Sequence, residues 1–333
     1  MNYDPIISVV MPVYNCSNYI NLAIESILNQ TFEKFEFIII NDASTDDTLI
    51  KILEYDDPRI VLLENTTQKG ICECINYGIS ISKGKYIARM DGDDISHSTR
   101  FEHQFVFMEE NPSVGILGTW YTILGTNDII KMPVKHEAIV LDMLEYSPLA
   151  HPTIFLRKSV LKDLITIYDQ QYIYAEDYEL WSRLILTTRA ENLPICLLAY
   201  RKHDNQSSNL YFLEQRISAK RVRLNLLKLL YHNFEVDLNS YELKAYLEKT
   251  GHSYNLISDT LEKIDKLLIS NLELKLFHQN LLKKKLLFKK IVVIRYFLKR
   301  QDLLNKIKYL KKFLSVLTSY YYRQIIFSKF SSG

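Results

Sequence analysis

Residues that mark several protein classes are scarce in this sequence, which has four cysteines, nine glycines and eight prolines among 333 residues. The cysteines lack a second pair at zinc spacing and are too few for a disulfide scaffold, so we expect reduced thiols. The composition, 47% hydrophobic and 24% charged, excludes collagen-like, disordered and coiled-coil chains. A chain of this length and apolar content can instead bury a sizeable core in one large or two ordinary domains.

Long apolar runs are missing as well. The longest uninterrupted runs span only a handful of residues, such as 291–294, which predicts that no helix crosses a membrane. The first five residues carry no basic side chain, and the apolar run after them stops at Pro12, so we expect no signal peptide. The sequence therefore favours a cytoplasmic protein.

The formal net charge is only +2, but the two signs are unevenly distributed. Residues 1–200 contain 15 Lys and Arg against 28 Asp and Glu, whereas residues 201–333 contain 26 against 11. Within the second part, residues 283–333 hold 14 basic residues and a single acid, Asp302. An acidic first part is thus joined to a strongly basic tail, and both need a functional explanation.

The first hundred residues alternate between strand-like and helix-like patterns. Apolar, β-branched runs predict strands at 6–11, 35–40, 60–63 and 86–90. Apolar residues on one helical face predict helices at 20–28, after 45 and at 71–81, with Ser17 capping the first and Ser44 or Thr45 starting the second. Successive β-α units of this kind predict an α/β fold with a mainly parallel sheet covered by helices on both faces.

The pattern becomes less regular after residue 110. We expect further strands at 114–124, 153–156 and 195–200, and a helix at 176–186. From about residue 213 the chain is rich in Leu and Lys with almost no Gly or Pro, which predicts helices. In this tail Leu303, Ile307, Leu310, Leu314 and Leu317 recur on one helical face. We place a domain boundary near residue 210.

Three of the predicted strands end in polar segments, at 12–15, 41–48 and 91–94. Ligands of open parallel sheets bind at the carboxyl ends of the strands, so these segments are candidate site residues. A dinucleotide site would need glycines after the first strand, where the chain has Pro12 and Tyr14, and no G-x-G-x-x-G or P-loop motif occurs. We therefore do not expect a nicotinamide or P-loop enzyme.

The segment Asp91-Gly92-Asp93-Asp94 is the strongest single signal. Three carboxylates within four residues repel one another, and oxygen-rich clusters of this kind suit Mg²⁺ or Mn²⁺, which bind a substrate diphosphate. A haloacid-type phosphatase also has a D-x-D motif, but places it on the first strand. The structural alternative is an Asp-rich turn in which Asp94 or Ser96 caps the next helix.

Read together, four motifs resemble those of family-two glycosyltransferases with the GT-A fold, a nucleotide-diphospho-sugar transferase fold. They are ISVVMPVYN at 7–15, SILNQT at 26–31, NDASTDDT at 41–48 and ARMDGDD at 88–94. The segments at 151–153, 174–181 and 200–208 are similar to bacterial members that build lipooligosaccharide or capsule glycans, notably β-N-acetylglucosaminyltransferases. The resemblance covers residues 5–210. It implies a catalytic domain at 1–210, with a nucleotide-binding half at 1–110 and an acceptor-binding half at 111–210, followed by a basic helical region at 211–333.

The resemblance also implies roles for individual residues. Asp177 is expected to be the general base. The expected nucleotide-sugar-binding residues are Pro12, Tyr14, Asn15, Asp42, Arg89, Asp91 and Gly92. Among them, Asp42 would accept a hydrogen bond from the uracil imide. Asp93 and His203 are the expected ligands of a Mn²⁺ or Mg²⁺ ion.

Several of these assignments have alternatives. Asp177 could be an acid favoured by a helix N-terminus, with Glu176 as a rival for the base. His151 and His203 could each be a structural histidine. Trp120 and Trp181 could be core residues, although Trp120, His151 and Glu176 are also candidates for the acceptor side.

The expected activity is an inverting, metal-dependent transfer of a hexose or N-acetylhexosamine from a UDP-sugar to a hydroxyl of a surface glycan. The alternatives are a non-catalytic glycan-binding protein, which should have lost motif acids, and a pyrophosphorylase, which should have a Gly-rich N-terminal phosphate loop. The expected partners are a lipid-linked oligosaccharide acceptor and an anionic membrane. The membrane would be contacted through basic helices that include Lys283–Lys285, Lys289 and Lys290. The competing explanation packs the apolar face of the tail on the catalytic domain. We expect no nucleic acid, because no nucleic-acid module accompanies the basic tail.

Overall fold

The computed structural model describes residues 4–204, 206–230, 254–299, 308–309 and 313. The chain divides into two compact units, Met1–Leu227 and Lys228–Gly333. Among the described residues, no helix combines the length and the apolar character needed to cross a lipid bilayer.

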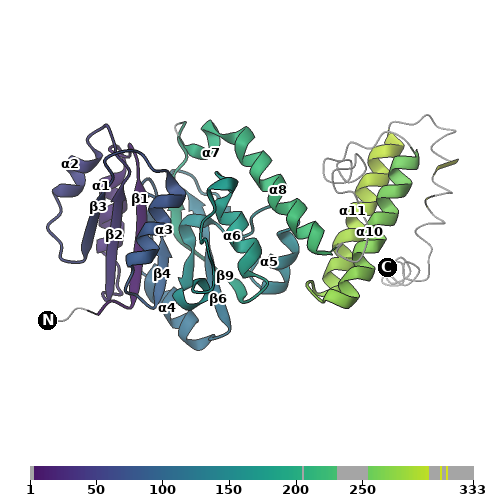
Figure 1. The fold of residues 1–333 in the computed structure, drawn as a ribbon, viewed down its shortest axis with the longest axis horizontal. Helices are drawn as coiled ribbons and strands as arrows, with labels where there is room; N and C mark the ends of the chain where they lie inside the picture. The colour runs from purple at the N-terminus through teal and green to yellow at the C-terminus, as the bar shows by residue number, and fades with distance from the viewer. Residues whose placement is uncertain (1–3, 205, 231–253, 300–307, 310–312, 314–333) are drawn as a thin grey trace. The chain divides into compact units, whose positions relative to one another are not determined.

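The first unit is built on one sheet whose first half is parallel (Figure 1). Its strands lie in the order β3-β2-β1-β4 and all run in the same direction. They are β1 (Ile7–Val13), β2 (Phe35–Asn41), β3 (Ile60–Glu64) and β4 (Tyr86–Arg89). The connecting helices are α1 (Ile20–Leu28), α2 (Thr48–Leu53) and α3 (Ile71–Ile81). The predicted β-α units and the parallel sheet are confirmed.

The two central strands form the core of this half because nearly all of their side chains are buried. Every residue of β2 is buried, and only Pro12 of β1 is partly exposed. On α1 the buried side chains are Ile20, Ala23, Ile24 and Ile27, the face that the apolar spacing predicted. A strand covered on both faces is apolar at most positions, and the two buried polar residues within the runs, Ser8 and Glu36, bond to each other, with Ser8 Oγ donating to Glu36 Oε1 at 2.6 Å.

The predicted helix caps are wrong. Neither α1 nor α2 has a side-chain cap, and their N-cap residues are Tyr19 and Asp47. The backbone N–H of Ser17 donates instead to Asp46 Oδ2 at 3.1 Å. A short polar side chain can bond to any backbone group within its reach, and here Asp46, in the loop after β2, lies within reach of the backbone of Ser17.

The second half of the sheet is mixed. It adds β8 (Phe155–Arg157) antiparallel to β4, β6 (Val114–Ile123) antiparallel to β8, and β9 (Arg189–Tyr200) parallel to β6. Two short strands, β5 (Ile95–Ser96) and β7 (Ile129–Ile130), pair with β9 and β6. The helices are α4 (Arg100–Glu110), α5 (His136–Asp142) and α6 (Glu176–Leu184). The predicted elements exist with shifted bounds: β9 begins six residues before the expected strand, and Thr153 belongs to a 3-10 turn at His151–Thr153 rather than to β8.

Pairing of β5 with β9 decides where the Asp-rich segment lies. Ile95 is opposite Ala199, and Ser96 is opposite Leu198. The chain therefore places residues 91–94, just before β5, beside residues 201–203, just after β9. The two segments are more than a hundred residues apart in the sequence.

The first unit continues through most of α8 (Phe212–Leu230), which follows the short helix α7 (Ser207–Leu210). Val222 and Leu226 of α8 are buried. The side chains of Arg221 and Arg223 donate to the carbonyls of Gln171 and Glu145. The domain boundary expected near residue 210 thus falls inside this unit, because α8 packs on the loop before α6.

The described part of the second unit is a pair of helices, α10 (Tyr254–Leu274) and α11 (Gln279–Lys299). Lys290, expected at a membrane surface, is fully buried and lies 2.6 Å from Asp265 Oδ1. Burial lowers the pKa of Lys290, although Asp265 opposes the shift. Lys290 therefore cannot contact a membrane in this conformation. All five residues of the predicted apolar face, which runs from Leu303 to Leu317, lie outside the described residues.

Candidate active site

The carboxyl ends of β1, β2 and β4 meet at one edge of the parallel sheet and carry most of the predicted nucleotide-binding residues. Pro12 is opposite Ile40, and Val13 is opposite Asn41. Tyr14 follows β1 and is 42% exposed, so its ring is open to a ligand. The sheet register therefore brings these distant segments together.

Asp42 is buried and organises the loop that follows β3. Its Oδ1 accepts hydrogen bonds from Asn65 Nδ2 at 2.7 Å and from Lys69 N at 2.8 Å, and its Oδ2 accepts one from Gly70 N at 2.8 Å. Burial by itself would raise the pKa of Asp42, but these hydrogen bonds outweigh it and lower the pKa. The thiol of Cys74 is a fourth hydrogen-bond partner of Asp42 and also lowers its pKa.

Asn15 ties the loop after β1 to the loop after β2. Its backbone N–H donates to Ser44 Oγ at 3.0 Å, and its Oδ1 accepts from Thr45 N at 2.8 Å. Asn15 has a φ of 50°, a left-handed conformation that asparagine tolerates better than most residues. Ser44 and Thr45 therefore hold this loop rather than start a helix.

The carboxylates of Asp91, Asp93 and Asp94 form a cluster in which one oxygen from each lies within 4.8 Å of the others. Burial raises the pKa of Asp93 and of Asp94, and the charge of Asp91 adds to both shifts. Asp94 is fully buried, and its Oδ2 has no hydrogen-bond partner among the residues that the structure describes. Three carboxylates that offer only oxygen ligands fit a hard divalent cation such as Mg²⁺ or Mn²⁺.

Asp94 does not cap the next helix, as the structural alternative supposed. Its Oδ1 accepts a hydrogen bond from Arg201 N at 2.8 Å, and Ser96 lies in β5. The N-cap residue of α4 is Thr99, without a side-chain cap. Asp94 thus fixes the start of the segment after β9 against the carboxylate cluster.

His203 lies beside the cluster, 2.9 Å from Asp93 Oδ2 through its Nε2. Its ring packs on the ring of Tyr19, with the ring centroids 4.9 Å apart. The guanidinium of Arg201 also lies over the ring of Tyr19, 4.7 Å from its centroid. Arg201 Nε also donates to Asp93 O at 2.7 Å. The two residues predicted to share a metal are therefore neighbours, held by Arg201 and Tyr19.

Arg89 provides the positive charge between the carboxylate cluster and α6. It is 3% exposed, and its Nη2 lies 2.6 Å from Asp91 Oδ1. Its charge lowers the pKa of both Glu176 and Asp177, against the larger effect of burial. Arg89 is thus close enough to act electrostatically on residues from both halves of the site.

The fully buried Arg100 bonds to the end of β4, the strand that carries Arg89. Its Nη2 donates to the carbonyls of Arg89 at 2.9 Å and Ile154 at 3.3 Å, and its Nε donates to Gln104 Oε1 at 3.0 Å. Arg100 therefore joins the strand that precedes the carboxylate cluster to the segment that follows His151.

Gly92 is needed for packing. A Cβ at this position would lie 2.7 Å from Val13 Cγ1 and 3.3 Å from Cys16 Sγ, closer than side chains pack. The carboxylate cluster can approach the end of β1 only because residue 92 has no side chain.

Glu176 and Asp177 begin α6 and differ in access. Glu176 is buried, whereas Asp177 is half-buried, and its Oδ1 accepts a hydrogen bond from Tyr178 N at 2.6 Å. Burial raises the pKa of Asp177 from 3.8 to about 6. Burial, together with the charge of Asp177, raises the pKa of Glu176 to about 7. Both carboxyls thus titrate in the range that suits a general base.

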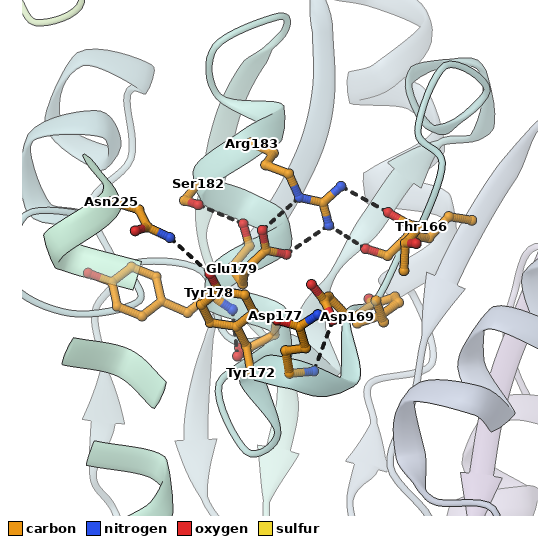
Figure 2. A network of polar contacts seen from close by, with 12 residues as sticks. Thr166, Asp169, Tyr172, Asp177, Tyr178, Glu179, Ser182, Arg183 and Asn225 are labelled. Carbon is orange, nitrogen blue, oxygen red and sulfur yellow. Dashed lines mark hydrogen bonds and ion pairs between the residues drawn. The ribbon is translucent and has the colours of Figure 1, made fainter. Parts of the chain in front are cut away.

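A polar network fixes α6 to the loop before it (Figure 2). The guanidinium of Arg183 makes two hydrogen bonds to Glu179, both 2.8 Å long, and two to the carbonyls of Thr166 and Ile167. In the same view Asn225 of α8 donates to the hydroxyl of Tyr172 at 2.9 Å. The helix that carries the base candidate Asp177 is therefore tied to the loop before it, and that loop is tied in turn to α8.

His151 packs in an aromatic cluster with Tyr168 and Trp181. Its Nε2 lies 3.0 Å from the Tyr168 hydroxyl, and burial lowers its pKa well below 6.5, so the ring is neutral. Trp181 is fully buried, as the core alternative predicted. Trp120, on β6, is half-buried, donates to Met132 O at 2.8 Å and has Lys131 over its ring.

Sequence reasoning missed Arg100, Arg201, Tyr19 and Arg183. Each acts through tertiary contacts with carbonyls or rings, and such contacts leave no spacing pattern in the chain. Arg201 lies in the segment 200–208, which resembles the family motif, and its place in that segment is the only sequence signal that could have identified it.

Comparison with known proteins identifies the family. The model for glycosyl transferase family 2 matches residues 8–169, which include β1 to β4 and the carboxylate cluster. An uncharacterized glycosyltransferase of Haemophilus influenzae is 32% identical over 334 residues, which cover 94% of this chain and 98% of that protein. This chain belongs to glycosyltransferase family 2. The resemblance based on the four motifs is confirmed.

Two further matches place this glycosyltransferase more closely. The Escherichia coli protein named UDP-Glc:alpha-D-GlcNAc-diphosphoundecaprenol beta-1,3-glucosyltransferase WfgD is 31% identical over 55% of the transferase and 70% of its own length. The crystal structure of Staphylococcus aureus TarS residues 1–349 with UDP-GlcNAc has a TM-score of 0.54 at 19% identity, covering 87% of the transferase and 89% of that chain. The transferase thus has the expected GT-A fold.

Proposed function

We propose that this glycosyltransferase moves a hexose or N-acetylhexosamine from a UDP-sugar to a hydroxyl of a growing, lipid-linked surface glycan such as lipooligosaccharide, lipopolysaccharide or capsule. The transfer is a single displacement that inverts the anomeric centre, so an α-linked donor gives a β-linkage. The observation that carries the proposal is that Arg89 acts on two acidic groups: it pairs with Asp91 of the carboxylate cluster, and its charge lowers the pKa of Glu176 and of Asp177.

On the donor side, Asp42 accepts a hydrogen bond from the uracil imide. Pro12 and Tyr14 flank the base, and Asn15 holds the loop that carries the tyrosine ring. Arg89 holds Asp91 in place for the ribose, as the ion pair between them supports.

Asp93 and His203 would hold a Mn²⁺ or Mg²⁺ ion, which when bound neutralises negative charge on the leaving diphosphate. Asp94 belongs to the same cluster, and its Oδ1 accepts a hydrogen bond from Arg201 N. Gly92 lets the cluster lie against the end of β1.

On the acceptor side, Asp177 is the general base. It removes the proton from the attacking hydroxyl as the new bond to the anomeric carbon forms and the bond to UDP breaks. Asp177 is favoured over Glu176 because it remains accessible, whereas Glu176 is 5% exposed. We place Trp120, His151 and Glu176 on the acceptor side, with His151 acting through Tyr168.

GlcNAc is our first candidate for the transferred sugar, supported by the TarS complex with UDP-GlcNAc; glucose is the second, supported by the name of WfgD. The name of WfgD also supports a lipid-diphosphate acceptor. Such an acceptor would be met at the inner face of the cytoplasmic membrane, where the exposed Lys284 and the half-buried Lys283, Lys285 and Lys289 could contribute positive charge.

The test is UDP release from UDP-GlcNAc, UDP-Glc, UDP-Gal and UDP-GalNAc, with and without a chelator. We expect one donor to be preferred and its turnover to be lost on chelation. Asp177→Asn should lower kcat by about 10² to 10⁴ with little change in UDP affinity, as for loss of a general base. Asp163→Asn, an exposed acid in the preceding loop, is the matched control.

Glu176→Gln decides between the rival bases. We expect it to keep most of the activity. If Glu176→Gln abolishes turnover while Asp177→Asn retains it, the base is Glu176 and the assignment of Asp177 is wrong.

A further inference from the structure

The segment after His203 exposes an apolar surface on the first unit. Leu210, Phe212, Leu213 and Ile217 are exposed by 59, 53, 68 and 63% respectively. We call these four residues the α8 apolar patch. Large apolar side chains are usually scattered singly on a protein surface, so four within eight residues indicate a contact surface.

The patch lies opposite the face of α8 that packs on the protein. Ser218, Val222 and Leu226 are buried and recur at a spacing of four, which defines the inner face. Leu213 and Ile217 are also four residues apart, but on the other side of the helix. α8 therefore has two apolar faces: one packs on the protein, and the second is exposed in the part of the chain that the structure describes.

The segment that contains this outer face is basic, and two of its cations, Arg221 and Arg223, also donate to carbonyls on the packed side. Between residues 207 and 227 the chain has four Lys and Arg residues and a single acid, Glu214. Arg216 is exposed, and its guanidinium lies over the ring of Phe212, 5.5 Å from the centroid. An exposed apolar stripe flanked by basic residues is complementary to an anionic lipid surface, where the apolar groups enter the headgroup region and the cations meet lipid phosphates.

The segment that carries the patch contacts the loop that leads into α6 and Asp177. The ring of Tyr211 stacks on Tyr174 with the centroids 4.3 Å apart and the planes 7° apart. Tyr174 has a φ of 66°, three residues before Asp177. Arg221 packs over Tyr172, 4.6 Å from the centroid. A surface that binds the patch therefore lies close in the structure to the residues that meet the acceptor.

We propose that the α8 apolar patch, with Arg216, is the surface by which the catalytic unit docks on an anionic membrane, so that a lipid-linked acceptor is presented on the side of Asp177. The role given to the docking, presentation of the acceptor, rests on the proposed function, whereas binding to the membrane requires no sugar transfer. It differs from the predicted contact through the basic tail, because the surface belongs to the first unit.

The test is sedimentation of the full chain with vesicles of phosphatidylglycerol and phosphatidylethanolamine, compared with vesicles of phosphatidylcholine alone. We expect binding to the anionic vesicles that weakens with salt. Leu213→Gln/Ile217→Gln should lower the vesicle partition coefficient at least about tenfold, because both side chains leave the apolar contact without a change in net charge.

The matched control is Ile50→Gln/Leu53→Gln on α2, where the two side chains are exposed by 61 and 64%. This control should bind vesicles like the unmodified chain, and both variants should keep UDP affinity, which shows that they are folded. UDP release without vesicles tests the proposed function separately.

Three outcomes would overturn the proposal. The first is undiminished vesicle binding by Leu213→Gln/Ile217→Gln, and the second is an equal loss in the α2 control. The third is a concentration-dependent dimer that this variant abolishes, since the patch would then be covered by a second copy of the chain.

Discussion

At the scale of single residues, the site depends on how neighbouring acids are distinguished. Glu176 and Asp177 are adjacent, yet only Asp177 combines access to a substrate with a raised pKa. Burial raises the pKa of Asp177, while the hydrogen bond from Tyr178 and the charge of Arg89 hold the shift in check. A carboxyl with a pKa of about 6 is a stronger base than an ordinary aspartate and is still ionised at neutral pH.

The pH dependence of the reaction should report this shift. A general base acts without its proton, and the pKa of Asp177 is about 6, so kcat/KM at saturating metal should fall about tenfold per unit as the pH drops below about 6. Initial rates of UDP release between pH 4 and 9 would measure it. A limb centred near 4, the value of an unshifted aspartate, would contradict the assignment.

At the scale of elements, the loop between β4 and β5 is held from three sides. Arg100 binds the carbonyl of Arg89, Arg201 binds Asp93 and Asp94, and Gly92 lies against Val13. The carboxylates repel one another, so the loop keeps this conformation only because its backbone is fixed by contacts from other elements. The precision of the site is therefore a property of the packing of β1, β4 and β9.

Gly92→Ala tests this packing. The new Cβ would meet Val13 Cγ1 at 2.7 Å, so we expect a loss of about 1–3 kcal/mol in stability and a displaced carboxylate cluster. The metal concentration for half-maximal activity should rise at least about tenfold. Gly92→Ala/Val13→Ala removes the clashing atom and should recover part of the metal affinity. If the double variant is no better than the single one, the close approach is not what the glycine provides.

At the scale of the whole molecule, every predicted site residue lies in the first compact unit, which extends to Leu227. The unit includes α8, which buries Val222 and Leu226 and contacts the loop at 170–172 that precedes α6. Residues 228–333 contain 20 Lys and Arg against 9 Asp and Glu, whereas the first unit contains 21 against 30, so the predicted site residues and the net positive charge are separable in the sequence.

Two truncations test this division. A chain ending at residue 230 should retain UDP binding and UDP release without a lipid acceptor. A chain ending at residue 210 loses the burial of Val222 and Leu226 and should be less stable by about 3 kcal/mol or more. Thermal unfolding of the two would show the difference. Equal stability would mean that α8 is not an integral part of the catalytic unit.

The sequence by itself determined the parallel half of the sheet and the family. A strand buried on both faces is mostly apolar, so β1, β2 and β4 were visible as runs, and their polar ends marked the site. Asp42 and the acids at 91–94 were found for the same reason. A polar group after a buried strand needs a partner or a ligand.

Only the tertiary structure decided which residues meet. The pairing of β5 with β9 places His203 against Asp93, and the packing of α8 on the loop before α6 moves the domain boundary and exposes the α8 apolar patch. Helix caps and the burial of Lys290 also depended on partners far away in the chain. Local spacing records the period of an element and the face it buries, but contacts between elements come from the sheet register and helix packing, which no local pattern encodes.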